Sequence, residues 1–142
     1  MRDKVRRVNL TKKLKLSITV AANPEDVYDA WLDSKKHAEM TGSEATVEPR
    51  INGRFTAWDG YIEGTTVELE PNKRIVQKWR TTDFPPNSPD STIEVILEKI
   101  ESGTRLTLIH SDIPEGQSDD YKTGWKDFYF DPMMRYFEDT SD

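Results

Sequence analysis

Residues 92–110 read TIEVILEKIESGTRLTLIH, two runs of alternating apolar and polar side chains separated by Glu101-Ser102-Gly103. A period of two is typical of β-strands that place one face on a core. The link is short enough for a hairpin, so the two strands are expected to run antiparallel. The side chains predicted to share the inner face are Ile93, Val95, Leu97, Leu106, Leu108 and His110.

The same period extends toward the N-terminus from this hairpin. Turn-like links rich in glycine, asparagine and proline separate further alternating runs. The longest break runs from Thr82 to Ser91 and contains three prolines, which excludes it from a central strand. Such links require an antiparallel sheet. The seven predicted strands span residues 14–20, 44–48, 53–58, 61–69, 74–81, 92–100 and 104–110.

Two short helices are expected between the first and second strands. Asn23-Pro24-Glu25-Asp26 offers a capping side chain, a proline suited to the first helical position and two acids beside the positive helix end. A second helix is expected to begin near Ser34 and to stop at Gly42, because glycine adopts the left-handed conformation that ends many helices.

A longer helix is predicted after Pro114, with Ser118 as its cap. Pro132 lies inside it and is expected to kink or divide it. Only this helix is long enough to cover one face of the sheet. We therefore predict an α+β helix-grip fold, a seven-stranded antiparallel sheet wrapped round a long C-terminal helix. The helix's expected aromatic face comprises Tyr121, Trp125, Phe128, Tyr129, Tyr136 and Phe137.

The composition suits one domain of 142 residues, 32% of them charged and 35% hydrophobic. Residues 1–15 hold seven basic side chains and one acid, which leaves 13 basic and 25 acidic residues for the remainder. An acidic body repels phosphate backbones, so nucleic acid is not an expected partner. We expect a basic leader at 1–13, the folded domain at 14–138 and an acidic tail at 139–142.

The chain lacks the signals of export or membrane insertion. It contains no cysteine, and its basic N-terminus is not followed by the apolar segment of a secretory signal. No apolar run approaches the roughly 20 residues that cross a bilayer. We therefore expect a cytoplasmic protein with no membrane span. Exposed strand edges leave both a monomer and a homodimer open.

Several segments resemble a known family over residues 14–138. ITV (18–20) and NPEDVYDAW (23–31) are similar to the opening of START-like (SRPBCC) proteins. A more specific similarity, to homologues of the activator of heat-shock protein 90 ATPase and to its C-terminal domain, is carried by Gly53-Arg54-Phe55, DGYIEG (59–64), Pro71, IVQKWR (75–80) and Gly124-Trp125.

This resemblance implies a helix-grip fold and makes a chaperone a candidate partner. The eukaryotic activator contains a second, N-terminal domain with a role in stimulating the chaperone. We expect no room for that domain in 142 residues, and no equivalent asparagine- and tryptophan-rich motif occurs. Single-domain relatives are mostly without an assigned activity, so binding is better supported than direct activation.

A ligand site in this fold would lie between the concave face of the sheet and the last helix. Gln77 and His110 are informative because they are polar residues on otherwise apolar rows. Each is also open to a structural role, in which its polar atoms are satisfied by neighbours or buried water or lie at the solvent end of the strand, and this role is the favoured interpretation for His110. The predicted ligand-binding residues are Phe55, Gln77, Trp79, Val95, Leu108, His110, Trp125 and Tyr129.

The four tryptophans could stack on an aromatic ligand or pack the core. Trp58 has the opposite strand parity from Phe55. It is therefore expected to face outward unless the Asp59-Gly60 turn rotates it.

Patterns for catalysis and metal binding are sparse. His37 and His110 are the only histidines, and they do not recur at a metal-binding spacing. Parity allows a His110–Asp112 acid–base pair, but an exposed acid is the usual explanation for a position beside Ile113-Pro114. We predict no catalytic residues, no metal and no cofactor.

Three functions remain open. The leading hypothesis is a non-catalytic protein that holds a hydrophobic small molecule between sheet and helix. The second is a co-chaperone-like protein that acts through its surface, with the basic arm or the Phe84-Pro85-Pro86 loop contributing. The third is a cyclase- or hydrolase-like enzyme that uses His110.

Overall fold

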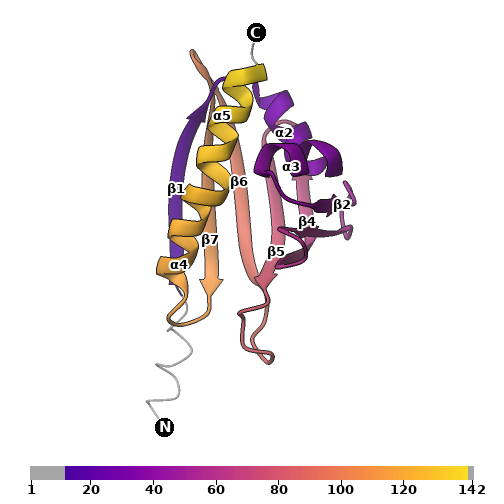
Figure 1. Cartoon of the computed structure of the whole chain (residues 1–142), viewed down its shortest axis with the longest axis vertical. Coiled ribbons are helices and arrows are strands. Elements are labelled where there is room, and N and C mark those ends of the chain that lie inside the picture. Colours follow the sequence, from indigo (N-terminus) through magenta and orange to yellow (C-terminus); the bar gives the residue numbers. More distant parts are fainter. Residues whose placement is uncertain (1–11, 141–142) are drawn as a thin grey trace.

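A computed structural model describes residues 12–140 and the side chains up to Glu138. Most of the basic leader and the end of the acidic tail therefore lie outside the described residues. The chain forms the predicted antiparallel sheet of seven strands, in the order β1-β7-β6-β5-β4-β3-β2 (Figure 1). The strands are β1 (Lys12–Val20), β2 (Ala45–Val47), β3 (Arg54–Ala57), β4 (Ile62–Glu70), β5 (Arg74–Thr81), β6 (Ser91–Ile100) and β7 (Gly103–Ile113).

Two short helices follow β1, as predicted: α2 (Pro24–Leu32) and α3 (Ser34–Thr41). The Asn23 side chain accepts a hydrogen bond of 3.0 Å from the backbone N–H of Asp26. The Asp33 carboxylate caps α3 in the same way, at 2.9 Å from the backbone nitrogen of Lys36. Gly42 ends α3 with φ +81°.

The C-terminal helix is continuous but changes its winding. It consists of α4 (Ser118–Gly124), a π-helical segment (Trp125–Phe130) and α5 (Asp131–Thr140). The backbone N–H of Asp131 donates to the carbonyl of Lys126, five residues earlier. Pro132 follows at once, so the predicted division of the helix falls beside this proline.

The predicted cap of this helix is wrong by one residue. Gln117 occupies the cap position and makes no side-chain bond to the helix's free N–H groups, while Ser118 is already in the first turn. The side chain of Gln117 is instead engaged by the Asp83 carbonyl at 2.9 Å and by the Tyr121 hydroxyl at 2.6 Å.

The helix's aromatic face also differs from the prediction at three positions. Phe128 is 53% exposed and Tyr136 is half-buried, whereas Phe130 is buried. A π-helix turns through a smaller angle per residue than an α-helix. The π-helical segment therefore places Phe128 at the solvent edge of the inner face and brings Phe130 into the core.

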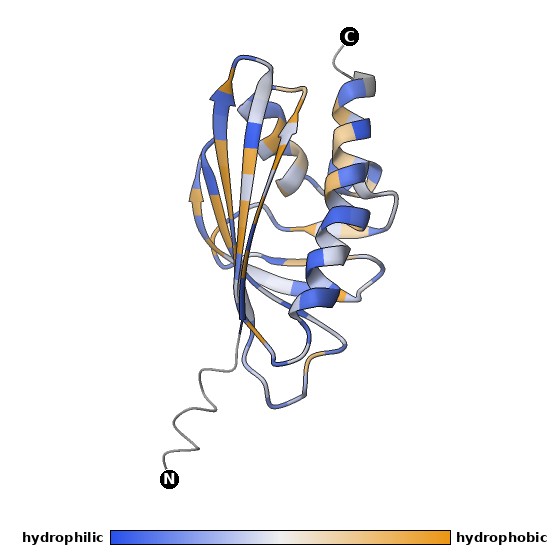
Figure 2. Ribbon diagram, turned by 90° about the vertical axis from the view of Figure 1, so that its left-hand side faces the viewer, coloured by the Kyte–Doolittle hydropathy of each residue, from blue (hydrophilic) through white to orange (hydrophobic). Residues whose placement is uncertain are grey.

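The C-terminal helix forms a second layer against the sheet (Figure 2). It contacts β1 through α4 and α5, while α3 contacts both α5 and the π-helical segment. Leu14, Leu16 and Ile18 are only partly buried, because β1 is an edge strand, but Val20 at its end is fully buried. None of the described helices is both long and apolar enough to span a bilayer.

Candidate ligand-binding site

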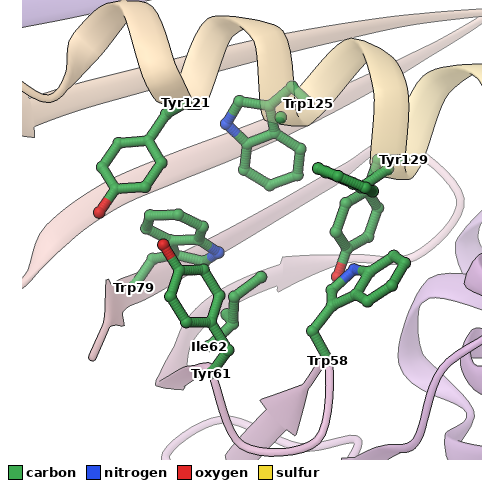
Figure 3. A pocket seen from close by; sticks show the side chains of 9 residues that line it. Trp58, Tyr61, Ile62, Trp79, Tyr121, Trp125 and Tyr129 are labelled. Atoms are coloured by element: carbon green, nitrogen blue, oxygen red, sulfur yellow. The ribbon is translucent and has the colours of Figure 1, made fainter. Parts of the chain in front are cut away.

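An apolar cavity of about 290 Å³ lies between the C-terminal helix and the strands β4 and β5 (Figure 3). Seven of its nine lining residues are aromatic. We call it the aromatic cavity. It is lined by Trp58, Tyr61, Ile62, Trp79, Tyr121, Gly124, Trp125, Phe128 and Tyr129.

The helix side of the aromatic cavity is built by residues four positions apart. Tyr121, Trp125 and Tyr129 point from the helix toward the strands (Figure 3). Gly124 leaves this wall open, since a Cβ atom there would meet only the Phe128 ring, at 3.9 Å. The absence of a side chain at Gly124 therefore contributes to the volume of the aromatic cavity.

The sheet side is centred on Trp79 of β5. Its ring centroid lies 5.5 Å from that of Trp125 and 5.1 Å from that of Tyr121. Gly64 of β4 stands opposite Trp79 in the strand register. A Cβ atom at Gly64 would collide with the Lys78 carbonyl and lie 2.6 Å from the Phe55 ring. Glycine at this position thus lets β5 and the Phe55 ring approach β4 closely.

The turn after β3 brings Trp58 to the rim. Trp58, Asp59 and Gly60 have φ values of +54°, +56° and +90°. This left-handed run rotates Trp58 inward, so the exception to the parity rule applies. Its ring meets the Phe128 ring edge-on at 5.3 Å. Its Nε1 atom is covered by protein and has no hydrogen-bond partner within residues 12–138.

Two tyrosine hydroxyls at the cavity are already engaged. Tyr61 donates to the Asp83 carboxylate at 2.6 Å. Tyr121 donates to the side-chain oxygen of Gln117, so Thr81 donates the bond of 2.7 Å that joins its hydroxyl to Tyr121. Burial raises the pKa of Tyr121. Both phenols therefore stay neutral and hold the rim in place.

The bonds of His110 settle which of its ring nitrogens carries the proton. The indole of Trp125 can only donate, so Nδ1 of His110 accepts its bond at 3.0 Å. Nε2 then carries the proton and donates to the Ser91 hydroxyl at 2.9 Å, and Ser91 donates to the Trp79 carbonyl at 2.7 Å. Burial lowers the pKa of His110 to about 3.

A second buried network lies deeper, toward α2 and α3. Nδ1 of His37 donates to the Trp31 carbonyl at 2.8 Å, which leaves Nε2 to accept from the Tyr129 hydroxyl at 2.9 Å. Gln77 accepts from the Trp31 indole at 3.0 Å and donates to Thr66 at 3.2 Å. Burial lowers the pKa of His37 and raises that of Tyr129.

The structure brings together part of the predicted site. Trp79, Trp125 and Tyr129 line the aromatic cavity. Phe55 and Gln77 lie deeper, beside a void of about 10 Å³ that has room for no more than a water molecule.

The remaining predicted site residues lie in the packed interior. Val95, Leu108 and His110 are at most 1% exposed and line neither the cavity nor the void. Asp112 is not a hydrogen-bond partner of His110. A bulge shifts the pairing of β7 with β1 after His110, and Asp112, with φ +61°, is exposed.

The sequence reasoning missed several lining residues. Tyr121 and Phe128 belong to the aromatic helix face predicted from sequence, and Ile62 alternates in step with the buried residues of β4, so the sequence did carry a signal for these three. Periodicity gave no signal for Tyr61 or Gly124, because one lies in a turn and the other contributes only the absence of a side chain. Among residues 12–138, no three acidic or histidine side chains gather as a metal site would require.

Residues 21–138 match the family model described as "Activator of Hsp90 ATPase homolog 1-like protein". The match covers most of the chain. The chain belongs to this family. Its family features coincide with the cavity, since Tyr61, Ile62, Trp79, Gly124 and Trp125 fall in the segments that carried the resemblance.

Curated proteins that are similar to this chain agree with the family assignment. The human "Activator of 90 kDa heat shock protein ATPase homolog 1" is 28% identical over 127 residues, which are 89% of this chain and 37% of the human protein. The chain thus spans about a third of the length of the curated relatives it matches.

Solved structures show the same fold. An HSP90 activator from Plasmodium falciparum superimposes with a TM-score of 0.77 at 25% identity, over 84% of this chain and 91% of that one. The Aha1 dimer from Colwellia psychrerythraea gives a TM-score of 0.74 at 18% identity, over 89% and 96% of the two chains. The helix-grip prediction is confirmed.

Proposed function

We propose that this protein binds a hydrophobic small molecule in the aromatic cavity and does no chemistry on it. The cavity itself carries the proposal, with seven aromatic side chains around about 290 Å³. Apolar surface left in contact with water is unfavourable for a folded protein. Its presence beside a glycine in a helix supports a site kept open for a ligand. The mostly apolar lining is typical of small-molecule pockets.

The absence of chemistry is inferred from the bonds of His110. A hydrolase would need Nε2 of His110 to accept the proton of Ser91. The Trp125 indole instead donates to Nδ1 of His110, so the proton of the neutral His110 ring is on Nε2. The Ser91 hydroxyl donates its own proton to the Trp79 carbonyl. His110 therefore donates to the Ser91 hydroxyl, whereas a base would have to accept the proton of its nucleophile.

Gly124 offers the test of binding. Gly124→Leu would extend a side chain into the cavity beside Phe128 without deleting any packing. Replacing a helical glycine contributes about 0.5–1 kcal/mol to stability, so the variant should fold. We expect the uncharged dye prodan to gain fluorescence with the natural protein and with Gly124→Ala, but not with Gly124→Leu. Undiminished dye binding by folded Gly124→Leu would contradict the proposal.

A second function, binding to a chaperone through the surface, is favoured by the family match and by the relatives' names. Pro85 and Pro86 are exposed in the loop between β5 and β6, whereas Phe84 is buried against Trp79. The phenylalanine therefore supports the loop instead of offering a contact, contrary to expectation. A cytoplasmic location and a monomeric or homodimeric state stay predictions.

The chaperone hypothesis has a direct assay. Adding this protein to the heat-shock protein 90 of the same organism should change its rate of ATP hydrolysis. Gly124→Leu is the matched control, because a surface interaction should survive filling of the cavity. An unchanged rate, with no binding at high concentration, would rule out this function.

A further inference from the structure

We propose that the ligand is an uncharged, planar aromatic molecule with a hydrogen-bond acceptor, and that the indole N–H of Trp79 receives this acceptor. The inference rests on the proposed function and names the class of ligand for the same cavity. Three features carry it: the charge of the lining, the arrangement of its rings, and the hydrogen-bonding state of its polar atoms.

The lining explains why the ligand is uncharged. Among the described residues, those at the aromatic cavity include no acid and no base. The nearby Asp83 carboxylate accepts the Tyr61 hydroxyl, and Arg80 donates to Asp90 and to the Ser88 carbonyl. A charged ligand would lose its water without gaining an opposite charge, which is strongly unfavourable.

The arrangement of the rings explains why the ligand is planar and aromatic. Tyr121, Trp125 and Tyr129 approach from the helix, and Trp79 and Trp58 face them from the strand side (Figure 3). Trp79 already touches Tyr121 and Trp125. A flat molecule would therefore lie beside these rings, on the side toward Trp58, and would meet the ring faces and edges of the lining. Offset and edge-to-face contacts of this kind are favourable between aromatic rings.

The polar atoms of the lining explain the acceptor. The Tyr61, Tyr121 and Tyr129 hydroxyls already donate to protein acceptors, and so does the Trp125 indole. Only the two indole N–H groups on the strand side have no acceptor within residues 12–138.

The two free indoles differ in their access. Nε1 of Trp58 is fully covered, whereas Nε1 of Trp79 is not. Trp79 as a residue is only 4% exposed, and its nitrogen is turned toward the middle of the cavity (Figure 3). A donor that opens into an apolar cavity has few other partners there, so an acceptor on the ligand gains the net free energy of one hydrogen bond. Trp79 is therefore the group that a ligand's carbonyl or ether oxygen can reach.

Three probes with the same ring system separate these features: acetylnaphthalene, its alkene isostere isopropenylnaphthalene, and the naphthoate anion, all substituted at the same position. We expect the ketone to bind roughly three- to tenfold more tightly than the alkene, as one hydrogen bond predicts. Naphthoate should bind more than about tenfold more weakly than the ketone. Tryptophan fluorescence titrations on the full chain measure all three.

Matched variants assign the hydrogen bond. Trp79→Phe keeps a ring but removes the N–H, and should make ketone and alkene bind equally. Trp58→Phe removes the covered N–H and should preserve the preference. In the natural protein, the ketone should move the indole N–H resonance of Trp79 further downfield than the alkene does, because the two probes share a ring system and only the ketone accepts a hydrogen bond. This readout does not depend on either variant folding.

Each contrary outcome has a distinct meaning. Equal binding of ketone and alkene, tight binding of naphthoate, an equal shift of the Trp79 resonance by both neutral probes, or loss of the preference in Trp58→Phe would each overturn the inference and leave hydrophobic binding standing. Failure of both neutral probes to bind would overturn the proposed function as well.

Discussion

Burial lowers the pKa of both histidines, and each ring nitrogen has a hydrogen-bond partner. His110 accepts from Trp125 and donates to Ser91, while His37 donates to the Trp31 carbonyl and accepts from Tyr129. Protonation of His110 would put a donor on Nδ1, facing the Trp125 indole, which can only donate. The Tyr129 hydroxyl beside His37 can instead turn and accept. The low pKa of His110 therefore has a geometric cause in addition to burial, whereas burial alone lowers the pKa of His37 against the effect of its bond to the Trp31 carbonyl.

This pairing predicts how stability depends on pH. The pKa of His110 is about 3 in the folded protein and about 6.5 when unfolded. As pH falls below about 6.5, the unfolded chain takes up the proton first. Stability from this group is complete above that pH and declines toward pH 3. Between about pH 7.5 and pH 5 the free energy of unfolding should fall by about 2 kcal/mol through His110.

Imidazole NMR measures this directly in the folded state. The ring resonances of His110 should not shift between about pH 8 and pH 5, and Nε2 should be the protonated nitrogen. A titration midpoint near the ordinary value of 6.5 would contradict the hydrogen-bond assignment.

At the scale of elements, two glycines act in opposite ways. The Phe55 ring and the Lys78 carbonyl lie close to Gly64 in β4 and leave no room for a Cβ atom there. Gly124 lies in the C-terminal helix, where a Cβ atom would meet only the Phe128 ring. The same substitution should therefore have opposite effects at the two positions.

We expect Gly64→Ala to lower the free energy of unfolding by about 1–3 kcal/mol, as overpacking of a tight contact does. Gly124→Ala should raise it by about 0.5–1 kcal/mol. Urea denaturation of the two variants measures both changes. If Gly64→Ala were as stable as the natural protein, the close approach of β5 and Phe55 to β4 would not be a constraint.

Elements with a local cause were predictable from sequence. The alternation in 92–110 required two paired strands, and Asn23 with Pro24 required a helix start. The π-helical segment was not predictable, because it has no composition of its own and depends on how the helix packs. The inward turn of Trp58 was foreseen only as an exception, since two successive non-glycine residues in left-handed conformations have no simple pattern.

At the scale of the whole molecule, the cavity is assembled from segments far apart in the sequence. The turn at Trp58, strand β5 and the C-terminal helix each supply part of its wall. The alternation of apolar and polar residues identified the inner face of each strand. It could not say which of those side chains reach the cavity and which pack in the interior. Val95 and Leu108 therefore pack the interior, while Trp79, near the end of β5, reaches the cavity.

The central claim is that the aromatic cavity holds a hydrophobic small molecule, and native mass spectrometry of gently purified protein tests it most directly. The folded protein should carry an added mass that dissociates on activation and is absent from the denatured protein. That adduct should be missing from Gly124→Leu prepared in the same host. An adduct of the same mass on folded Gly124→Leu would contradict the claim, because that ligand would be bound outside the cavity.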